Sequence, residues 1–323
     1  MKNIINILYI LFGTVFALGA CQSEGIQDTP TEADKPIEFS GVYATIETKS
    51  AEGLPVNDFR VWASRTYTVG SVTDTEYGIF GVTGTEVTNS STGSTPSWAY
   101  SPVRYWRPGT YDFIAVSPLT LAEGELTNDG LELDFGDGWD LCSSQTDLWI
   151  ASTPNVSNEV VPLTFNRMLS KISFTAVNVA TDLDIFVTGF KVYGLCKKAI
   201  SYSIGYGWTC DNPASATTPY KSYTLSSVEL PITGETPYSL TTDGGFLAFP
   251  GEISLGVEVT FNHGGNTTNY SKSTSVTDTW VAGTHYEYKI NIGPDYIEFN
   301  PVSVQPWDDN EGNGYTADDS IEF

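Results

Sequence analysis

The side chains that most often carry out chemistry are sparse in this sequence. It has two histidines, His263 and His285, and neither is spaced from a cysteine or a carboxylate as a metal ligand would be. No Gly-x-Ser-x-Gly motif places a serine nucleophile, and no glycine motif for phosphates or dinucleotides occurs. We therefore expect a protein that is not an enzyme and that holds no cofactor.

Carboxylates are dense in two stretches, DFGDGWD and WDDNEGNGYTADD. Their acidic residues include Asp134, Asp137, Asp140, Asp308, Asp309 and Glu311. Calcium loops space their ligands as D-x-[DN]-x-[DN]-G, and neither stretch has that spacing. Two carboxylates in a cleft could also serve a glycoside hydrolase. Acidic surface turns account for both stretches, so we predict no metal site and keep calcium binding and a β-sandwich hydrolase as alternatives.

Aromatic residues gather in the stretch SWAYSPVRYWRPG, which contains Trp98, Tyr100, Tyr105 and Trp106. Exposed aromatic rings stack on sugars, whereas buried ones complete a hydrophobic core. We favour the core, and keep ligand contact by Trp98, Tyr105 and Trp106 as the alternative.

The cysteines divide into one near the N-terminus, Cys21, and three further along the chain, Cys142, Cys196 and Cys210. Three cysteines in so long a chain make no disulfide scaffold, and no Cys-x-x-Cys motif occurs. Cys196 and Cys210 could pair across a hairpin, which would leave Cys142 free. Geometry decides that pairing, and the sequence leaves it open.

Residues 1–20 have the features of an export signal. Lys2 is followed by an apolar run too short to span a membrane comfortably, and small residues precede Cys21. Leu-Gly-Ala-Cys resembles the bacterial lipobox, in which the cysteine is lipidated. We predict that residues 1–20 are removed and that Cys21 carries the lipid. More than one long acyl chain would then anchor the protein firmly to a bilayer.

Composition limits both the fold and the partners. The chain has 39 acidic and 15 basic residues, a formal net charge of −24, and loss of the signal leaves about −25. Such a charge opposes binding to nucleic acid and docking on anionic lipid. Aromatic residues are abundant, with Tyr 18, Phe 16 and Trp 8, and no long stretch has helical periodicity. These features indicate an all-β extracellular protein.

Alternating apolar residues predict strands, separated by polar and glycine-rich turns. Residues 21–36 are polar and acidic, as in a flexible tether, and IEFSGVYATIETK is the first strand, with a kink at Ser40-Gly41. The polar stretch STPNVSNEV, residues 152–160, reads as a linker. We therefore expect two β-sandwich domains, residues 37–157 and 158–323.

Five stretches together resemble the fimbrillin superfamily, the subunits of type V pili in Bacteroidetes. They are SPVRYWRPGTYDFIAVSP, TDLWIAS, VPLTFNRMLSKISF, WVAGTHYEYKINI and VSVQPW, and they occur in the family's order. The resemblance covers about residues 37 to 307. It implies a lipoprotein precursor with two transthyretin-like β-sandwich domains.

The resemblance also implies a route of assembly. In that family the precursor reaches the cell surface at the outer membrane, and a surface protease cuts after a basic residue that follows the first strand. That position corresponds here to the bond between Lys49 and Ser50, and many relatives have arginine in place of Lys49. The alternative is that Lys49 is simply a charged residue at the end of a strand. Arg60 and Arg65 are the nearest other candidate cleavage sites. Loss of the first strand opens a groove in the first domain, and a strand from a neighbouring subunit then fills this groove by β-augmentation.

A fimbrial subunit of structural and adhesive function is thus the expectation. Its partners would be other fimbrial subunits and host or bacterial surface glycans or proteins. The candidate donor strand, Gly314–Phe323, is acidic and alternates poorly, which suits a tip or accessory subunit. The alternative is a surface-anchored lipoprotein that binds glycans in a nutrient-uptake system.

Overall fold

The structure is a computed structural model that describes residues 35–44, 57–91, 96–180, 182–211, 218–230, 237–265 and 268–307, with the backbone alone for 41–44. Within these ranges the only helical element is one turn, η1 (Leu119–Leu121), and the rest of the regular structure is β-strand. The prediction of an all-β protein is confirmed. In the same ranges, no helix has the length and apolar character to cross a bilayer.

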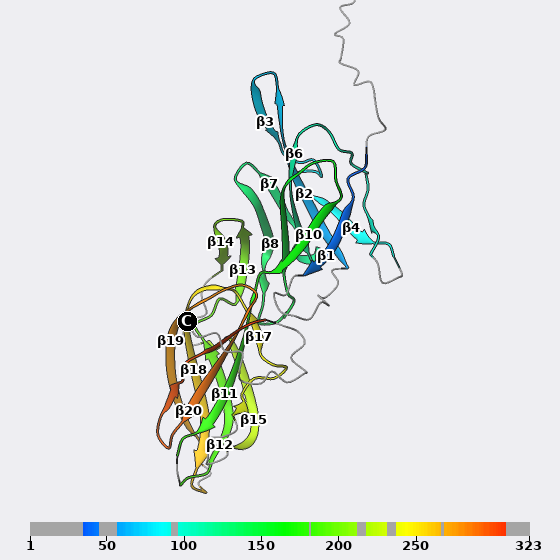
Figure 1. Ribbon diagram of the computed structural model, residues 1–323. Coiled ribbons are helices and arrows are strands. Elements are labelled where there is room, and N and C mark those ends of the chain that lie inside the picture. The colour runs from blue at the N-terminus through cyan, green and yellow to red at the C-terminus, as the bar shows by residue number, and fades with distance from the viewer. Residues whose placement is uncertain are drawn as a thin grey trace, which may run out of the picture. The chain divides into compact units, whose positions relative to one another are not determined.

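An eight-stranded sheet contains the first strand of the chain at its edge. Its order is β1 (Phe39–Ala44), β10 (Val161–Arg167), β9 (Trp149–Val156), β6 (Thr110–Ser117), β2 (Asp58–Val69), β4 (Thr85–Asn89) and β5 (Trp98–Ala99), with β3 (Val72–Glu76) paired to the far end of β2. β1 runs parallel to β10, whereas the other pairs are antiparallel. Figure 1 shows β1 lying beside β10, although more than a hundred residues separate them in sequence.

A four-stranded sheet joins strands from distant parts of the chain. Its order is β14 (Gly207–Cys210), β13 (Lys198–Ser203), β8 (Gly130–Asp140) and β7 (Gly124–Thr127). The stretch DFGDGWD was expected to be a loop and instead forms the end of β8. Gly136 and Gly138 have φ of 58° and 98°, so the strand bulges there, and the pairing with β13 moves from Asp134 to Trp139.

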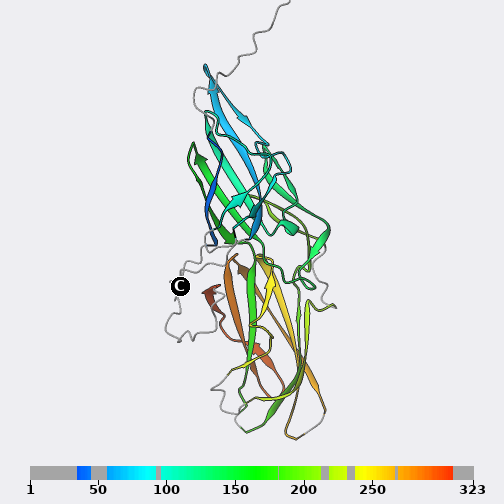
Figure 2. The ribbon, with the colours of Figure 1, turned by 90° about the vertical axis from the view of Figure 1, so that its right-hand side faces the viewer.

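Two further sheets contain most of the later strands. One consists of β16 (Tyr238–Ser239), β11 (Ser170–Asn178), β20 (Thr284–Ile292) and β21 (Ile297–Phe299), with β17 (Phe246–Ala248) and β22 (Ser303–Pro306) attached to β11 and β20. The other has the order β15 (Lys221–Leu230), β12 (Ile185–Tyr193), β18 (Gly251–His263) and β19 (Tyr270–Trp280). Figure 2 shows the green strands β11 and β12 among the gold and orange strands β18 to β20, as the pairings require.

The period-two alternation of apolar residues explains where the cores form. In β10, every second residue from Val161 to Arg167 is buried, so one face of the strand packs inward. One core lies on that face of the eight-stranded sheet and includes residues of β1, β2, β6, β9 and β10. A second core joins the other face to the β7–β8–β13–β14 sheet, and a third lies between the two later sheets.

The chain passes from the eight-stranded sheet to the later sheets only after β10, which lies beyond the boundary predicted after residue 157. The polar stretch 152–160 is the end of β9 and the turn into β10, with φ of 59° at Asn155 and 51° at Asn158. β10 then joins the eight-stranded sheet, and β13 pairs with β8 across the predicted boundary. A polar, turn-rich stretch has the same composition in a hairpin as in a linker, which explains the difference.

Candidate functional site

The first strand and the residues that enclose it form the site that matches the predicted assembly. Backbone groups bind this segment on both sides. On one side the Val161 amide donates to the Glu38 carbonyl at 2.8 Å, and β1 continues in register with β10. On the other side the Ile37 amide donates to the Arg104 carbonyl at 2.9 Å. Residues 35–39 thus lie between β10 and the loop that contains residues 100–107.

Two side chains of this segment are built into the core. Ile37 is 1% exposed and Phe39 is 7% exposed, whereas Glu38 and Ser40 point to solvent. The Phe39 ring has its centroid 5.6 Å from that of Phe59, and Phe80, Tyr100 and Phe113 lie at similar distances. Burying a side chain of this size contributes about 1.5–3 kcal/mol, so β1 contributes to the core as well as to the edge of the sheet.

The loop of residues 100–107 forms the second wall around the first strand. The Tyr100 hydroxyl donates to the Ile37 carbonyl at 2.7 Å, and the Trp106 amide donates to the Lys35 carbonyl at 3.0 Å. Pro36 and Tyr105 form an isolated antiparallel bridge. Lys35 and Pro36, which the sequence placed in the flexible tether, are therefore hydrogen-bonded parts of the folded structure.

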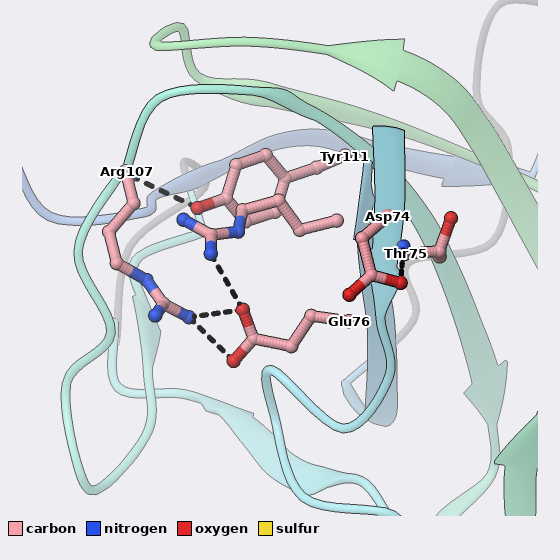
Figure 3. Close-up of polar contacts among 6 residues, drawn as sticks. Asp74, Thr75, Glu76, Arg107 and Tyr111 are labelled. Atoms are coloured by element: carbon pink, nitrogen blue, oxygen red, sulfur yellow. Dashed lines mark hydrogen bonds and ion pairs between the residues drawn. The ribbon is translucent and has the colours of Figure 1, made fainter. Parts of the chain in front are cut away.

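An ion-pair cluster fixes the end of this loop (Figure 3). The Arg107 guanidinium donates to both carboxylate oxygens of Glu76, at 3.0 and 3.1 Å, and Arg65 pairs with the same carboxylate at 2.8 Å. The Arg107 amide donates to the Tyr111 hydroxyl at 3.0 Å. Because Glu76 ends β3, the β2–β3 hairpin holds the loop in place against the first strand.

Electrostatics agree with this geometry. Burial raises the pKa of Tyr100, which keeps its hydroxyl protonated as a donor to Ile37. Burial alone would lower the pKa of Arg107, but the hydrogen bond and the charge of Glu76 outweigh it and raise that pKa.

The residues predicted for lipidation and processing lie outside the part of the chain that the structure describes. They are Cys21, Lys49 and Ser50. The described backbone ends at Ala44 on one side of the processing position and resumes at Asn57 on the other. The candidate donor segment, Gly314–Phe323, also lies outside the described residues.

The aromatic residues singled out as ligand contacts have three different environments. Trp106 is 7% exposed and packs edge-on against Tyr111, with ring centroids 4.8 Å apart. Trp98 is half-buried, 5.0 Å from the Phe59 ring. Only Tyr105, at 48% exposure, faces solvent. Trp106 is not available as a ligand contact, because its ring is buried in the hydrophobic core.

The cysteines and histidines have structural surroundings. Cys196 and Cys210 form a disulfide with an S–S distance of 2.01 Å, and among the described cysteines Cys142 is free. Burial raises the pKa of the Cys142 thiol to about 11. His285 is buried and bonds through Nε2 to the Ser173 hydroxyl at 2.8 Å, and His263 stacks on Tyr270.

Acidic side chains serve local turns rather than a shared centre. Asp134 accepts the Gly136 amide at 2.8 Å, and Asp140 accepts the Cys142 amide at 2.8 Å. Within the described ranges, no three or more histidine, cysteine or acidic side chains are placed to hold a metal ion. Asp308, Asp309 and Glu311 lie outside those ranges.

The sequence did not reveal the loop that encloses the first strand. Its key contacts join residues far apart in the chain, such as Tyr100 with Ile37 and Arg107 with Glu76. No periodicity reports contacts of this kind. The closest signal was the aromatic density of residues 98–106, which indicated a core without showing which strand it covers.

Comparison with known proteins gives one family and several solved structures. The model of a family described as fimbrillin-like matches residues 56–307. A candidate cell adhesion protein from Parabacteroides distasonis is 9% identical, with a TM-score of 0.51 over 84% of this chain and 96% of the other. Another from Bacteroides ovatus is 15% identical, with a TM-score of 0.50 over 85% of this chain and 99% of the other. At these identities the similarity concerns the fold alone.

One further solved structure is that of the fimbrial anchor protein Mfa2 from Porphyromonas gingivalis. It is 9% identical to this chain, with a TM-score of 0.42 over 85% of this chain and 98% of the other. Comparison with curated protein sequences finds no match.

Proposed function

The chain belongs to the fimbrillin-like family, and we propose that it is a fimbrial subunit that joins its neighbours at the cell surface by strand exchange. In this proposal a protease removes the first strand, and a strand from an adjacent subunit takes its place. The single observation that supports it best is the position of β1: an edge strand whose Phe39, together with Ile37 just before it, is built into the core.

Removal of an edge strand breaks one ladder and leaves the others intact. β1 pairs with β10 alone, so its loss would uncover the backbone of β10 while the remaining strands of the sheet stay paired. It would also uncover the core positions that Ile37 and Phe39 occupy. An incoming strand would gain backbone hydrogen bonds and apolar burial together, which is what β-augmentation requires.

The positions of basic residues favour one cleavage site. Lys49 is the only lysine or arginine between β1 and β2. Arg60 lies within β2, with an 18% exposed side chain that pairs with Glu86 at 2.8 Å, so the folded strand protects it. Lys35 precedes Pro36, a bond that trypsin-like enzymes cut poorly, and its backbone is hydrogen-bonded. Cleavage after Lys49 would release everything from Cys21 to β1 in one piece.

Lipidation at Cys21 and residence at the outer membrane complete the proposal for the precursor. The lipid would hold the subunit at the surface until the protease frees it. A place at the tip or as an accessory subunit is the finer part of the proposal, because Gly314–Phe323 is a poorly alternating donor.

The test is limited trypsin treatment of the purified precursor and of a Lys49→Gln variant, with N-terminal mapping and electron microscopy. We expect the wild-type product to begin at Ser50 and to polymerise, alone or with partner subunits. The variant should remain uncut between β1 and β2 and stay monomeric. Clean cleavage after Lys49 with no assembly under either condition would refute strand exchange.

A further inference from the structure

A second site lies away from the first strand, beside the disulfide. A cavity of about 580 Å³ is bordered by the β12–β13 connection, the β13–β14 hairpin and the start of β18. This volume lies in the range of about 300–1,000 Å³ that small-molecule sites have. No residue of this cavity belongs to the groove around β1.

Aromatic rings form one side of the cavity. Tyr206 and Trp208, both in the β13–β14 hairpin, line it together with Phe249. Tyr206 is 85% exposed, the highest value among the large apolar and aromatic side chains that the structure describes as exposed. Trp208 is fixed from behind, with its ring 4.8 Å from Phe249 and 4.7 Å from Tyr202. The exposed Tyr206 ring and the packed Trp208 ring thus offer aromatic surface to a ligand in the cavity.

The walls are held by covalent and backbone constraints. The Cys196–Cys210 disulfide ties the hairpin to the β12–β13 connection, and both cysteines line the cavity. Gly194 has φ +81°, and a Cβ there would lie 1.9 Å from the Ser254 carbonyl oxygen, so only glycine allows this approach. The Tyr206 amide closes the hairpin turn on the Ser203 carbonyl at 3.1 Å.

Polar and charged groups define the ligand further. Among the described residues of the lining, Glu252 is the only charged one, and Ser254 adds a hydroxyl beside it. None of these described residues is a lysine, arginine or histidine, so a sulfated, phosphorylated or carboxylated ligand would meet a negative charge there. A carboxylate and a hydroxyl suit a ligand with hydroxyl groups to donate, and the aromatic rings suit one with an apolar face.

We propose that this cavity binds a neutral sugar residue, which stacks on Tyr206 and Trp208 and donates hydroxyl hydrogen bonds to Glu252. A pyranose ring combines an apolar C–H face with a rim of hydroxyl groups, as the lining requires. The site would add glycan recognition to the subunit, and it is independent of strand exchange because no part of it involves β1.

The test measures saturation transfer in NMR from the purified protein to a neutral panel of lactose, N-acetyllactosamine, mannotriose, cellotriose and xylotriose. Tyr206→Ala should weaken binding of the responding sugar roughly tenfold, since it removes the stacking surface. Glu252→Gln should also weaken binding of that sugar. The matched control is Tyr296→Ala, which removes a tyrosine that is 44% exposed and lies outside both sites, and it should leave the affinity within about twofold.

Three results would overturn the proposal. One is the absence of transfer to every neutral sugar of the panel, including the case in which the cavity takes up an apolar dye instead. Another is equal binding by wild type and Tyr206→Ala, or loss of binding in the Tyr296→Ala variant alone. The third is binding of 3′-sialyllactose but not lactose, since that would require a positive charge that the lining does not have. Matching melting temperatures of the variants establish that each is folded.

Discussion

At the scale of single residues, Phe39 connects the first strand to the core. Its ring contacts come from β2, β6 and the loops that hold Phe80 and Tyr100. Ile37 is buried beside it, but Phe39 is the larger side chain and the one that lies within the paired strand. The stability of β1 in its groove should therefore depend on this residue more than on any other in the segment.

We predict that Phe39→Ala lowers the free energy of unfolding by about 3–5 kcal/mol, because it leaves a cavity among aromatic rings. It should also speed proteolysis between β1 and β2. Urea denaturation and timed trypsin digestion measure the two effects.

Glu38→Ala is the control for that prediction, because Glu38 is the exposed neighbour of Phe39 and should change the free energy of unfolding by about 0.5 kcal/mol or less. Similar losses in both variants would mean that β1 owes its place to backbone pairing rather than to burial.

Residue patterns predicted some of these features and missed others for physical reasons. Alternation of apolar residues predicted the first strand, which contains Phe39, because the side chains on one face of a strand repeat every two residues. Trp106 and Tyr105 are adjacent in the chain, yet one is core and the other is exposed. Loop residues have no fixed period, so the sequence could not distinguish them.

At the scale of elements, one arginine joins strands from the middle of the chain to the last described residue, Trp307. Arg167, at the end of β10, has its guanidinium 4.2 Å from the Trp149 ring centroid and 3.7 Å from that of Trp307, which directly follows β22. It also pairs with Asp147, and the side chains of the pair are 5% and 16% exposed. The end of β22 is thus attached to β9 and β10 of the eight-stranded sheet.

We predict that Arg167→Ala lowers the free energy of unfolding by about 3–5 kcal/mol, since it removes the guanidinium that neutralises the largely buried Asp147 carboxylate and leaves a gap beside two tryptophan rings. Tryptophan fluorescence during urea denaturation measures this.

The matched control is Lys191→Ala, which removes an ion pair with Glu258 whose side chains are 42% and 22% exposed. Its cost should be about 1 kcal/mol or less. A cost for Arg167→Ala no greater than that of the control would show that the tryptophans pack equally well without the guanidinium.

The positions of many strands could be predicted from the sequence, but the strands with which they pair could not. β11, β18 and β20 alternate over many residues and were expected from the sequence. The pairing of β13 with β8 joins segments about sixty residues apart and has no local signal, so the domain boundary was drawn without it.

At the scale of the whole molecule, charge controls association. The chain has a formal net charge of −24, so identical subunits repel one another as they approach. Under the proposed strand exchange, the backbone pairing and burial that join two subunits are short-range and change little with salt. The charge repulsion between subunits acts over a longer distance, and salt screens it.

We predict that assembly of the processed subunit is faster at about 0.5 M than at about 0.05 M sodium chloride, because the Debye length falls severalfold over that range. Light scattering after protease treatment measures the rate, with uncleaved Lys49→Gln protein as the control for nonspecific aggregation. A rate that falls with salt would instead indicate complementary charged patches at the contact.

The parallel pairing of β1 with β10 has a consequence for how each copy is made. Lys35 and Asn158, which are bonded to each other at the start of this pairing, stand 123 residues apart. A ribosome makes β1 first, yet β1 has no partner until β10 has emerged, and closing so long a loop is slow. β1 is therefore expected to stay unpaired until the chain has been made at least as far as β10. Every new copy passes through an interval in which its groove is vacant, and crowding during that interval favours entry of the wrong strand.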